Sequence, residues 1–341
     1  MSDVLLEVQD LNVSFQTFDG EARVLNGVNL SVRRGEAVAI VGESGCGKTV
    51  TVKAIMGLLP EGSSRIGSGL IRFKGNDLLG LRSADWSRIR GHQISMVFQD
   101  PMTHLNPVFS VGDQLTDVLL WSGQQRVGLV RWLLGSLQRG KRNEARKRAA
   151  EWLQRVRLPD PEGALARYPV ELSGGMRQRV LIALGLITEP DLLIADEPGT
   201  ALDVSIQDQI LELLEDLVAT QGTSLLFITH NLGVARRISQ RIYVMYAGEV
   251  VETGSTQEVF DHPRHPYTQG LLASIPKLTG EMGEGIAGRI PNFVAPPPGC
   301  RFAPRCPFHT DQCDVQQPPL VEVAPGHQVA CTLYEEGASG Q

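Results

Sequence analysis

The chain has 341 residues, which suits one large domain with an extension or two domains. Hydrophobic residues make up 42% and charged residues 21%, as in an ordinary globular protein, and the net charge of -6 argues against a general nucleic-acid binder. The start, MSDVLLEVQD, is acidic where a signal peptide is basic, and the apolar runs are far shorter than a membrane span. We therefore expect a cytosolic protein, unless a partner carries it to a membrane.

The first residues predict short strands, and an α/β pattern follows. Residues 6–15 and 24–32 alternate apolar and polar positions, as half-buried antiparallel strands do. Continuous apolar runs, typical of strands buried on both faces, are AVAIVG (37–42), LLIADEP (192–198) and SLLFITH (224–230). Segments 143–156 and 204–219 are helix-like, and 242–254 resembles a closing hairpin. Buried strands alternating with helices predict an α/β sheet.

The composition changes after about residue 260. A glycine-rich stretch at 280–288 and the run APPPGC bring much proline and little periodicity. We therefore predict one domain at 1–260 and a separate loop-rich extension at 261–341.

The stretch GESGCGKT fits the pattern of a phosphate-binding loop, and it lies between a predicted strand and a predicted helix as that pattern requires. Its glycines let successive backbone N–H groups wrap nucleotide phosphates at a helix N-terminus. Lys48 would reach the β- and γ-phosphates, and the Thr49 hydroxyl would hold Mg²⁺. Cys46 is expected to be a small tolerated residue in the loop and not a metal ligand. The nucleotide-binding residues predicted here are Gly42, Glu43, Ser44, Gly45, Cys46, Gly47, Lys48 and Thr49.

The strand LLIADEP delivers two carboxylates to its end. Asp196 is suited to hold Mg²⁺ through water, and Glu197 to polarise the attacking water. An acidic turn after a strand is common by itself, but together with an upstream phosphate loop it indicates ATP chemistry.

The segment ELSGGMRQR (171–179) resembles the signature of ATP-binding cassette (ABC) ATPases. Four further stretches fit that family in order, namely Phe15 as the adenine-stacking aromatic with Phe18 as a fallback, Gln99 in VFQDP, TALD ending at Asp203, and His230 in FITH. The resemblance implies an α/β P-loop ABC cassette, with a RecA-like core, an antiparallel β subdomain and a helical subdomain at about 100–180.

The resemblance also implies a role for each motif. Ser173, Gly174 and Gly175 begin a helix and offer a second anion site. In the family this site closes over ATP held by a partner's phosphate loop, so that two subunits enclose two nucleotides. His230 would contact the γ-phosphate, and Gln99 would sense the Mg²⁺ and the nucleotide.

The segment PRHPYTQGLLASIP (263–276) resembles the C-terminal extension of dipeptide/oligopeptide importer ATPases, of which nickel importers are close relatives. That resemblance implies a second, often non-identical ATPase subunit, two membrane permeases and an extracytoplasmic binding protein. It places the chain on the cytoplasmic face of the bacterial inner membrane as a peripheral subunit. Import of nickel or another small solute stays open. A soluble ABC ATPase acting on nucleic acid or ribosomes is disfavoured, because the chain has one phosphate loop and no sustained heptads.

Residues 121–148 hold eight Lys or Arg and one acid. Val130, Leu133, Leu134 and Leu137 would share one helical face. We favour a solvated helix packed on its own subdomain. Contact with anionic lipid or with the permeases is the alternative.

Four of the five cysteines, Cys300, Cys306, Cys313 and Cys331, fall within 32 residues. Disulfides are rare in the cytosol, so the cluster indicates a metal centre. The paired spacing of structural zinc sites is absent, and the spacing alone does not name the metal. The importer resemblance implies a [4Fe-4S] cluster. The alternatives are zinc, with His309 or His327 replacing a thiolate, and buried free thiols.

Overall fold

The computed structural model describes residues 3–122, 139–199, 203–275 and 285–337. These residues form two compact units, one from 1–79 with 227–341 and one from 80–226. The boundary that the composition predicts near residue 260 therefore lies within the first unit. Among the described residues, no helix is long and apolar enough to cross a membrane.

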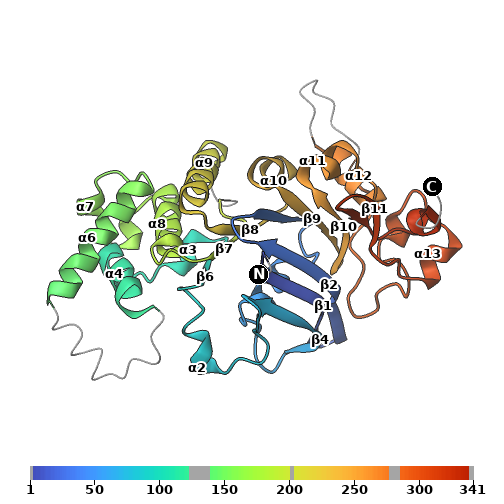
Figure 1. Cartoon of the computed structure of the whole chain (residues 1–341), viewed down its shortest axis with the longest axis horizontal. Helices are drawn as coiled ribbons and strands as arrows, with labels where there is room; N and C mark the ends of the chain where they lie inside the picture. The colour runs from blue at the N-terminus through green and yellow to red at the C-terminus, as the bar shows by residue number, and fades with distance from the viewer. Residues whose placement is uncertain (1–2, 123–138, 200–202, 276–284, 338–341) are drawn as a thin grey trace. The chain divides into compact units, whose positions relative to one another are not determined.

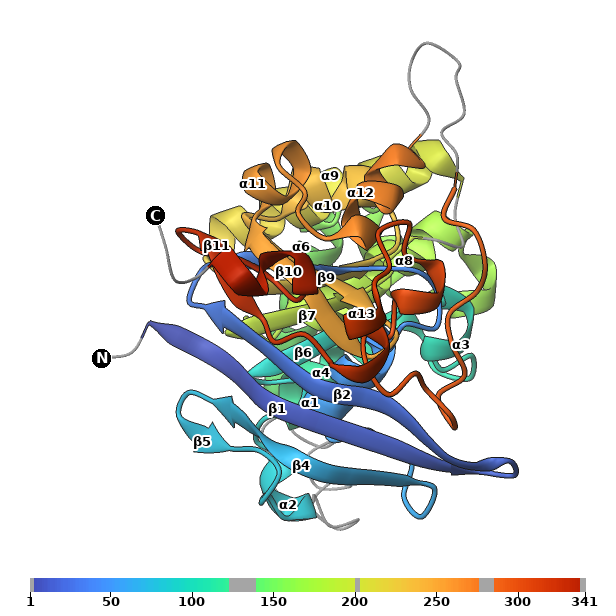
Figure 2. The same cartoon turned by 90° about the vertical axis from the view of Figure 1, so that its right-hand side faces the viewer.

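The first unit begins with the antiparallel sheet that the alternating pattern predicts. Its strands, in the order β2-β1-β4-β5, are β1 (Val4–Thr17), β2 (Gly20–Arg33), β4 (Ser64–Phe73) and β5 (Asn76–Asp77). Figure 2 shows β1, β2 and β4 as long neighbouring ribbons. Leu6, Val8, Leu11 and Val13 are buried, which fixes the register of β1 because a shift by one residue would expose them.

The first unit also contains a mixed sheet. Strand β3 (Ala37–Val41) is buried along its whole length and runs parallel to β9 (Arg241–Tyr246), which forms the predicted hairpin with β10 (Glu249–Ser255). β10 then pairs with β12 (His327–Val329), and β12 with β11 (Val321–Ala324). The extension predicted from 261 therefore contributes two strands to this sheet.

Short helices complete the first unit. They are α1 (Lys48–Ile55), α10 (Leu232–Ile238), α11 (Thr256–Asp261), α12 (Pro266–Ala273), η2 (Ala303–Arg305), α13 (Asp311–Val315) and η3 (Thr332–Gly337). One buried cluster joins residues from β3, α10, β9 and α12 with Phe302 of the extension. Removing such large apolar groups from water is the main term that holds the extension to the sheet.

The second unit is mostly helical, and Figure 1 shows α4, α6, α7 and α8 grouped together. Its elements are α2 (Ser83–Trp86), β6 (Ile94–Val97), α3 (Pro101–His104), α4 (Val111–Trp121), α6 (Arg139–Arg155), α7 (Pro161–Ala164), η1 (Pro169–Glu171), α8 (Gly174–Leu186), β7 (Leu192–Asp196) and α9 (Val204–Gln221). Strands β6 and β7 are parallel, and β8 (Ser224–Thr229) crosses the boundary between the units.

Helix α6 confirms the predicted helix at 143–156. Ala145, Ala149, Trp152 and Leu153 are buried at helical spacing, so one face packs inward. Of the basic segment 121–148, the structure describes only residues 121–122 and 139–148. The apolar face predicted for Val130, Leu133, Leu134 and Leu137 lies outside the described residues.

Candidate functional site

The phosphate loop joins the end of β3 to the start of α1, as predicted. Gly42, Gly45 and Gly47 have φ angles of 151°, 82° and 107°, which L side chains rarely adopt. A Cβ at Gly42 would overlap the carbonyl oxygen of Met245, and one at Gly47 would lie 2.8 Å from Leu25 Cδ2. The loop therefore requires glycine at these two positions both for conformation and for space.

Lys48 directs its ammonium group back along the loop. Its Nζ donates to the carbonyl oxygens of Gly42 at 2.7 Å and Glu43 at 3.0 Å, and the side chain is buried. Thr49 follows in the first turn of α1 and is half-buried. Cys46 is fully buried, and burial raises the pKa of its thiol, so it packs as a small neutral side chain.

The two acidic residues stand at the end of β7, as predicted, in the second unit. Asp196 is buried, and Glu197 follows it with a φ of 47°. A non-glycine residue at positive φ stores strain, which is common at functional sites. Gln99 lies beyond β6, the strand parallel to β7, and its Nε2 donates to Glu197 Oε2 at 3.1 Å. The structure therefore brings Gln99 and Glu197 together, because the carboxyl ends of parallel strands meet at one edge of a sheet.

The signature segment forms a helix N-terminus, also in the second unit. Ser173 is exposed and caps α8, with its Oγ accepting a hydrogen bond from Met176 N at 3.4 Å. Gly174 and Gly175 form the first turn. A Cβ at Gly175 would lie 2.8 Å from Ile206 Cγ2, so α8 approaches α9 closely there. The N–H groups of this first turn and the helix dipole favour an anion.

The remaining predicted residues lie at strand ends and turns. His230 is exposed directly after β8, and Asp203 is exposed at the N-cap of α9. The other residues of TALD, Thr200 to Leu202, lie outside the described residues. Phe15 is half-buried in β1 opposite Ala22, whereas Phe18 is fully exposed.

The four clustered cysteines line one small cavity in the first unit. Cys300, Cys306, Cys313 and Cys331 surround it together with His265 and apolar side chains. Cys300 N donates to Cys313 O at 2.8 Å, which ties two of the four together. Neither His309 nor His327 lines this cavity.

The two histidines proposed as zinc ligands have other partners. His327 is buried and its Nε2 lies 2.7 Å from Glu252 Oε1, whereas the Nε2 of His309 lies 2.9 Å from Asp314 Oδ1. His265, which does line the cavity, is a residue that the sequence did not reveal. The Nδ1 of His265 accepts a hydrogen bond from Tyr267 N at 3.0 Å, as the N-cap of α12.

Burial is the largest influence on the pKa values of these four cysteines. It raises the pKa of Cys300 to about 12 and also raises the pKa of Cys306 and Cys331. For Cys313 burial acts in the same direction, but hydrogen bonds with Thr310 and Thr332 bring its pKa below the ordinary value. Within the described ranges, no three His, Cys, Asp or Glu side chains stand close enough to hold a metal ion. Four thiols are the kind of donor set that zinc and iron–sulfur centres use.

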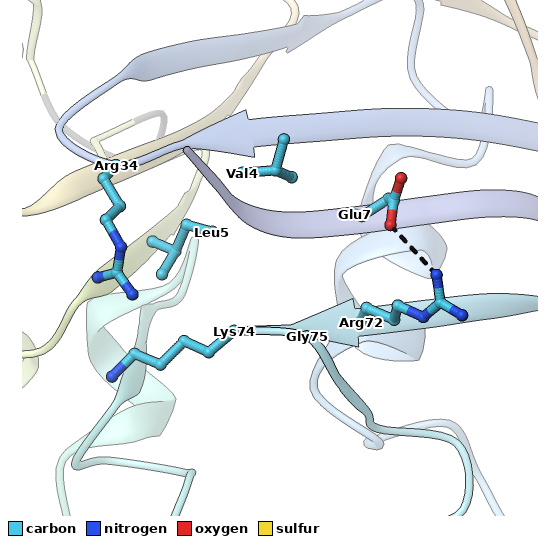
Figure 3. Close-up of a pocket in the computed structure, with 7 residues that line it drawn as sticks. All are labelled: Val4, Leu5, Glu7, Arg34, Arg72, Lys74 and Gly75. Carbon is cyan, nitrogen blue, oxygen red and sulfur yellow. Dashed lines mark ion pairs between the residues drawn. The ribbon is translucent and has the colours of Figure 1, made fainter. Parts of the chain in front are cut away.

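A separate basic hollow lies on the antiparallel sheet (Figure 3). It has a volume of about 610 Å³, and Arg34, Arg72 and Lys74 line it together with Glu7, which pairs with Arg72 at 3.8 Å. It contains none of the predicted nucleotide-binding residues.

Two families match successive parts of the chain. Residues 25–200 match the ABC transporter family, and residues 251–313 match the oligopeptide/dipeptide transporter C-terminal region. The first match includes the phosphate loop, Gln99, the signature and the acidic strand end. The second includes Cys300, Cys306 and Cys313.

Known proteins extend this likeness over the whole chain. The oligopeptide transport ATP-binding protein AppD of Bacillus subtilis is 45% identical and aligns over 99% of both chains. The dipeptide transport ATP-binding protein DppD of the same organism is 46% identical, over 98% of this chain and 96% of its own. The dimeric cassette MJ0796, solved in a post-hydrolysis state with ADP and Pi, has a TM-score of 0.62 and 26% identity, over 74% of this chain and 99% of its own. The chain belongs to the ABC transporter family of ATPases, in the group that carries the oligopeptide/dipeptide transporter C-terminal region.

Proposed function

We propose that this chain hydrolyses ATP to drive the uptake of di- or oligopeptides through a membrane importer. The observation that carries the proposal is the full-length likeness to AppD and DppD, which extends through the C-terminal region. A cassette alone would fit transporters of many solutes, whereas this C-terminal region takes its name from peptide transport.

The roles of the site residues are proposed from the ABC family motifs. The loop amides and Lys48 bind the β- and γ-phosphates, and the buried position of Lys48 against its own loop supports this role. Glu197 activates the attacking water, and Gln99 orients Glu197 by the hydrogen bond between them. By the same motifs, Thr49, Gln99 and Asp196 would hold Mg²⁺, His230 would contact the γ-phosphate, and Phe15 would stack on adenine.

A second ATPase subunit follows from the position of the signature. We assign Ser173, Gly174, Gly175 and Asp203 to the nucleotide held by the partner subunit. The exposed helix N-terminus at Ser173 supports this assignment, because it offers amides for a phosphate. The partner is proposed to be a non-identical ATPase of the same family.

The permeases are proposed to dock on an apolar patch of the second unit. This patch consists of the exposed side chains Met102, Val108, Phe109, Tyr168 and Val170. The patch comes from two segments of the chain, 102–109 and 168–170. Val111 N donates to Arg167 O and Gly112 N donates to Leu165 O, each at 2.9 Å, and these two hydrogen bonds hold the segments close together. Arg177 of α8 bonds Pro169 O and contacts Met102 Sδ, which links the patch to the signature helix. Exposed apolar side chains at one place mark an interaction surface.

Docking there would hold the chain at the cytoplasmic face of the bacterial inner membrane, with an extracytoplasmic binding protein delivering substrate on the other side. A reconstituted transporter in proteoliposomes tests the proposal. Peptide should enter vesicles only with ATP, the binding protein and intact Lys48. Uptake of Ni²⁺ without peptide uptake would contradict the choice of substrate.

We also propose that Cys300, Cys306, Cys313 and Cys331 hold a [4Fe-4S] cluster. Their convergence on one cavity supports this, as does the shortness of the helices and strands between Cys300 and Cys331, which a cross-link would stabilise. When bound, the cluster supplies four metal–thiolate bonds. Anaerobic purification followed by iron, sulfide and zinc analysis is the test. About four iron and four sulfide per chain is the expected result, and zinc alone would contradict it.

A further inference from the structure

Two arginines lie within the cysteine-bearing segment, each next to a cysteine that lines the cavity. Arg301 follows Cys300, and Arg305 precedes Cys306. The two side chains are only 4% and 5% exposed, so both guanidinium groups must find partners inside the protein.

Arg305 finds its main partner in the phosphate loop. Its Nη1 lies 2.9 Å from Glu43 Oε2, and its Nη2 lies 3.1 Å from Glu43 Oε1. The remaining donors bond Ile286 O at 3.1 Å, Ala287 O at 2.8 Å and Tyr246 Oη at 3.4 Å. A two-pronged pair of this kind fixes both position and angle.

Glu43 is held at three points. Besides Arg305 on its carboxylate, its backbone N–H donates to Tyr267 Oη at 2.9 Å, and its carbonyl oxygen accepts from Lys48 Nζ at 3.0 Å. Tyr267 in turn packs against Phe302, with ring centroids 5.5 Å apart. The extension therefore contacts the loop residue whose backbone already holds the catalytic lysine.

Arg301 makes a second connection to the same loop. It pairs with Glu249 at 3.2 Å and donates to Ala247 O. The next residue, Gly248, donates its N–H to Cys46 O of the phosphate loop at 2.7 Å. Both arginines of the cysteine segment thus support the loop, one directly and one through the turn between β9 and β10.

We propose that Arg305 is a positioning residue for ATP binding, which keeps the Glu43 carboxylate away from Lys48 and couples the phosphate loop to the cysteine segment. The proposal rests on the proposed binding of ATP by this loop. Without the guanidinium, the Glu43 carboxylate loses its ion-pair partner. Since the Glu43 carbonyl already lies at the ammonium of Lys48, the carboxylate of the same residue is free to turn and pair with that ammonium. It would then compete with the phosphates.

The test is the dissociation constant for ATP, measured by calorimetry on the anaerobically purified full chain. Arg305→Gln should weaken ATP binding about tenfold, because the Glu43 carboxylate then pairs with Lys48 and competes with the phosphates for it. Adding Glu43→Gln to that variant should restore binding to within about threefold of the native value, because the competing charge is gone. The dissociation constant of Arg305→Lys for ATP should lie between those of the native chain and of Arg305→Gln. Arg289→Gln, at an exposed arginine in the same extension, is the matched control and should bind as the native chain does.

The free energies of unfolding of the same variants, measured without ATP, separate positioning from general stability. If Arg305 served only the fold, the ATP affinities of the variants would follow their unfolding free energies, and that result would overturn the inference. Native-like binding by Arg305→Gln would overturn it as well. The metal content of Arg305→Gln should equal that of the native chain, since a loss would show damage to the cysteine site instead. Absence of ATP binding by the unaltered chain would overturn the proposed function and this inference with it.

Discussion

The Gln99 side-chain amide donates a hydrogen bond of 3.1 Å to Glu197 Oε2, at the ends of two neighbouring parallel strands. Glu197 reaches this position with a φ of 47°, so its backbone and its side chain are both constrained. An oriented carboxylate serves as a base better than a mobile one, because its geometry is set before the substrate arrives.

Replacing Gln99 by Ala should lower kcat for ATP about 10- to 100-fold. The reason is that Glu197 loses the hydrogen bond that orients it. Gln93→Ala is the matched control, since that glutamine belongs to the same unit and its side chain bonds the Arg88 carbonyl. Steady-state hydrolysis measurements decide the outcome, and an unchanged kcat for Gln99→Ala would remove Gln99 from the site.

The phosphate loop should not tolerate a methyl group at Gly47. Gly47→Ala combines a φ of 107° with a contact of 2.8 Å, so we expect a loss of about 1–3 kcal/mol in unfolding free energy and failure to bind ATP. Gly35→Ala is the control, because Gly35 also has a positive φ, of 67°, but has open space around it. Chemical denaturation and ATP binding measure the two effects. Equal ATP affinity in both variants would show that Gly47 is not required for space.

Glu36 should make stability depend on pH in the acid range. Burial raises the pKa of Glu36, but hydrogen bonds from Arg241 and from Arg33 N outweigh it, and the pKa falls below the ordinary value. A carboxyl with a lowered folded pKa stabilises the fold above its unfolded pKa, and the contribution is lost as pH falls through the folded value.

Glu36→Gln should therefore lower the free energy of unfolding by about 1–3 kcal/mol at neutral pH, and by progressively less as the pH falls. Denaturation curves at several pH values measure the difference between the variant and the native chain. A difference that stays constant down to the most acid pH would contradict the assignment.

Removing the proposed metal from the cysteine site should both destabilise the chain and weaken ATP binding. Cys300, Cys306 and Cys331 lie outside helices and strands and Cys313 lies in the five-residue helix α13, so a metal would add order to the segment. Arg305 adjoins Cys306. We expect Cys306→Ser to lower Tm by at least about 4 °C and to raise the dissociation constant for ATP. Cys46→Ala should keep the native metal content, since Cys46 belongs to the phosphate loop. Equal Tm values for Cys306→Ser and the native chain would show that these cysteines hold no structural metal.

Local patterns in the sequence predict much of this molecule. The buried run at 37–42, followed by GESGCGKT, predicts β3, the loop and α1, because glycine spacing and strand burial are short-range properties. The pairing of Gln99 with Glu197 is not predicted in this way, because no local pattern indicates strand β6, which ends just before Gln99. The convergence of the four cysteines is predictable, because cysteines gathered in one segment of a cytosolic chain are typical of a shared site.

What the sequence does not reveal depends on contacts between distant residues. Nothing near Arg305 indicates that it pairs with Glu43, which lies 262 positions away. The pairing of β12 with β10 is hidden because β12 has only three residues and almost no pattern. His265 looks like an ordinary helix cap in HPYT, and only the fold places it at the cysteine cavity.

The most direct test of the proposed ATPase is the turnover of Glu197→Gln. The variant keeps the hydrogen-bonding shape at Glu197 but loses the negative charge of the base. ATP hydrolysis in the assembled transporter should fall at least about 100-fold, while the dissociation constant for ATP stays within about threefold of the native value. Turnover equal to that of the native chain would contradict the assignment of Glu197 and the account of hydrolysis built on it.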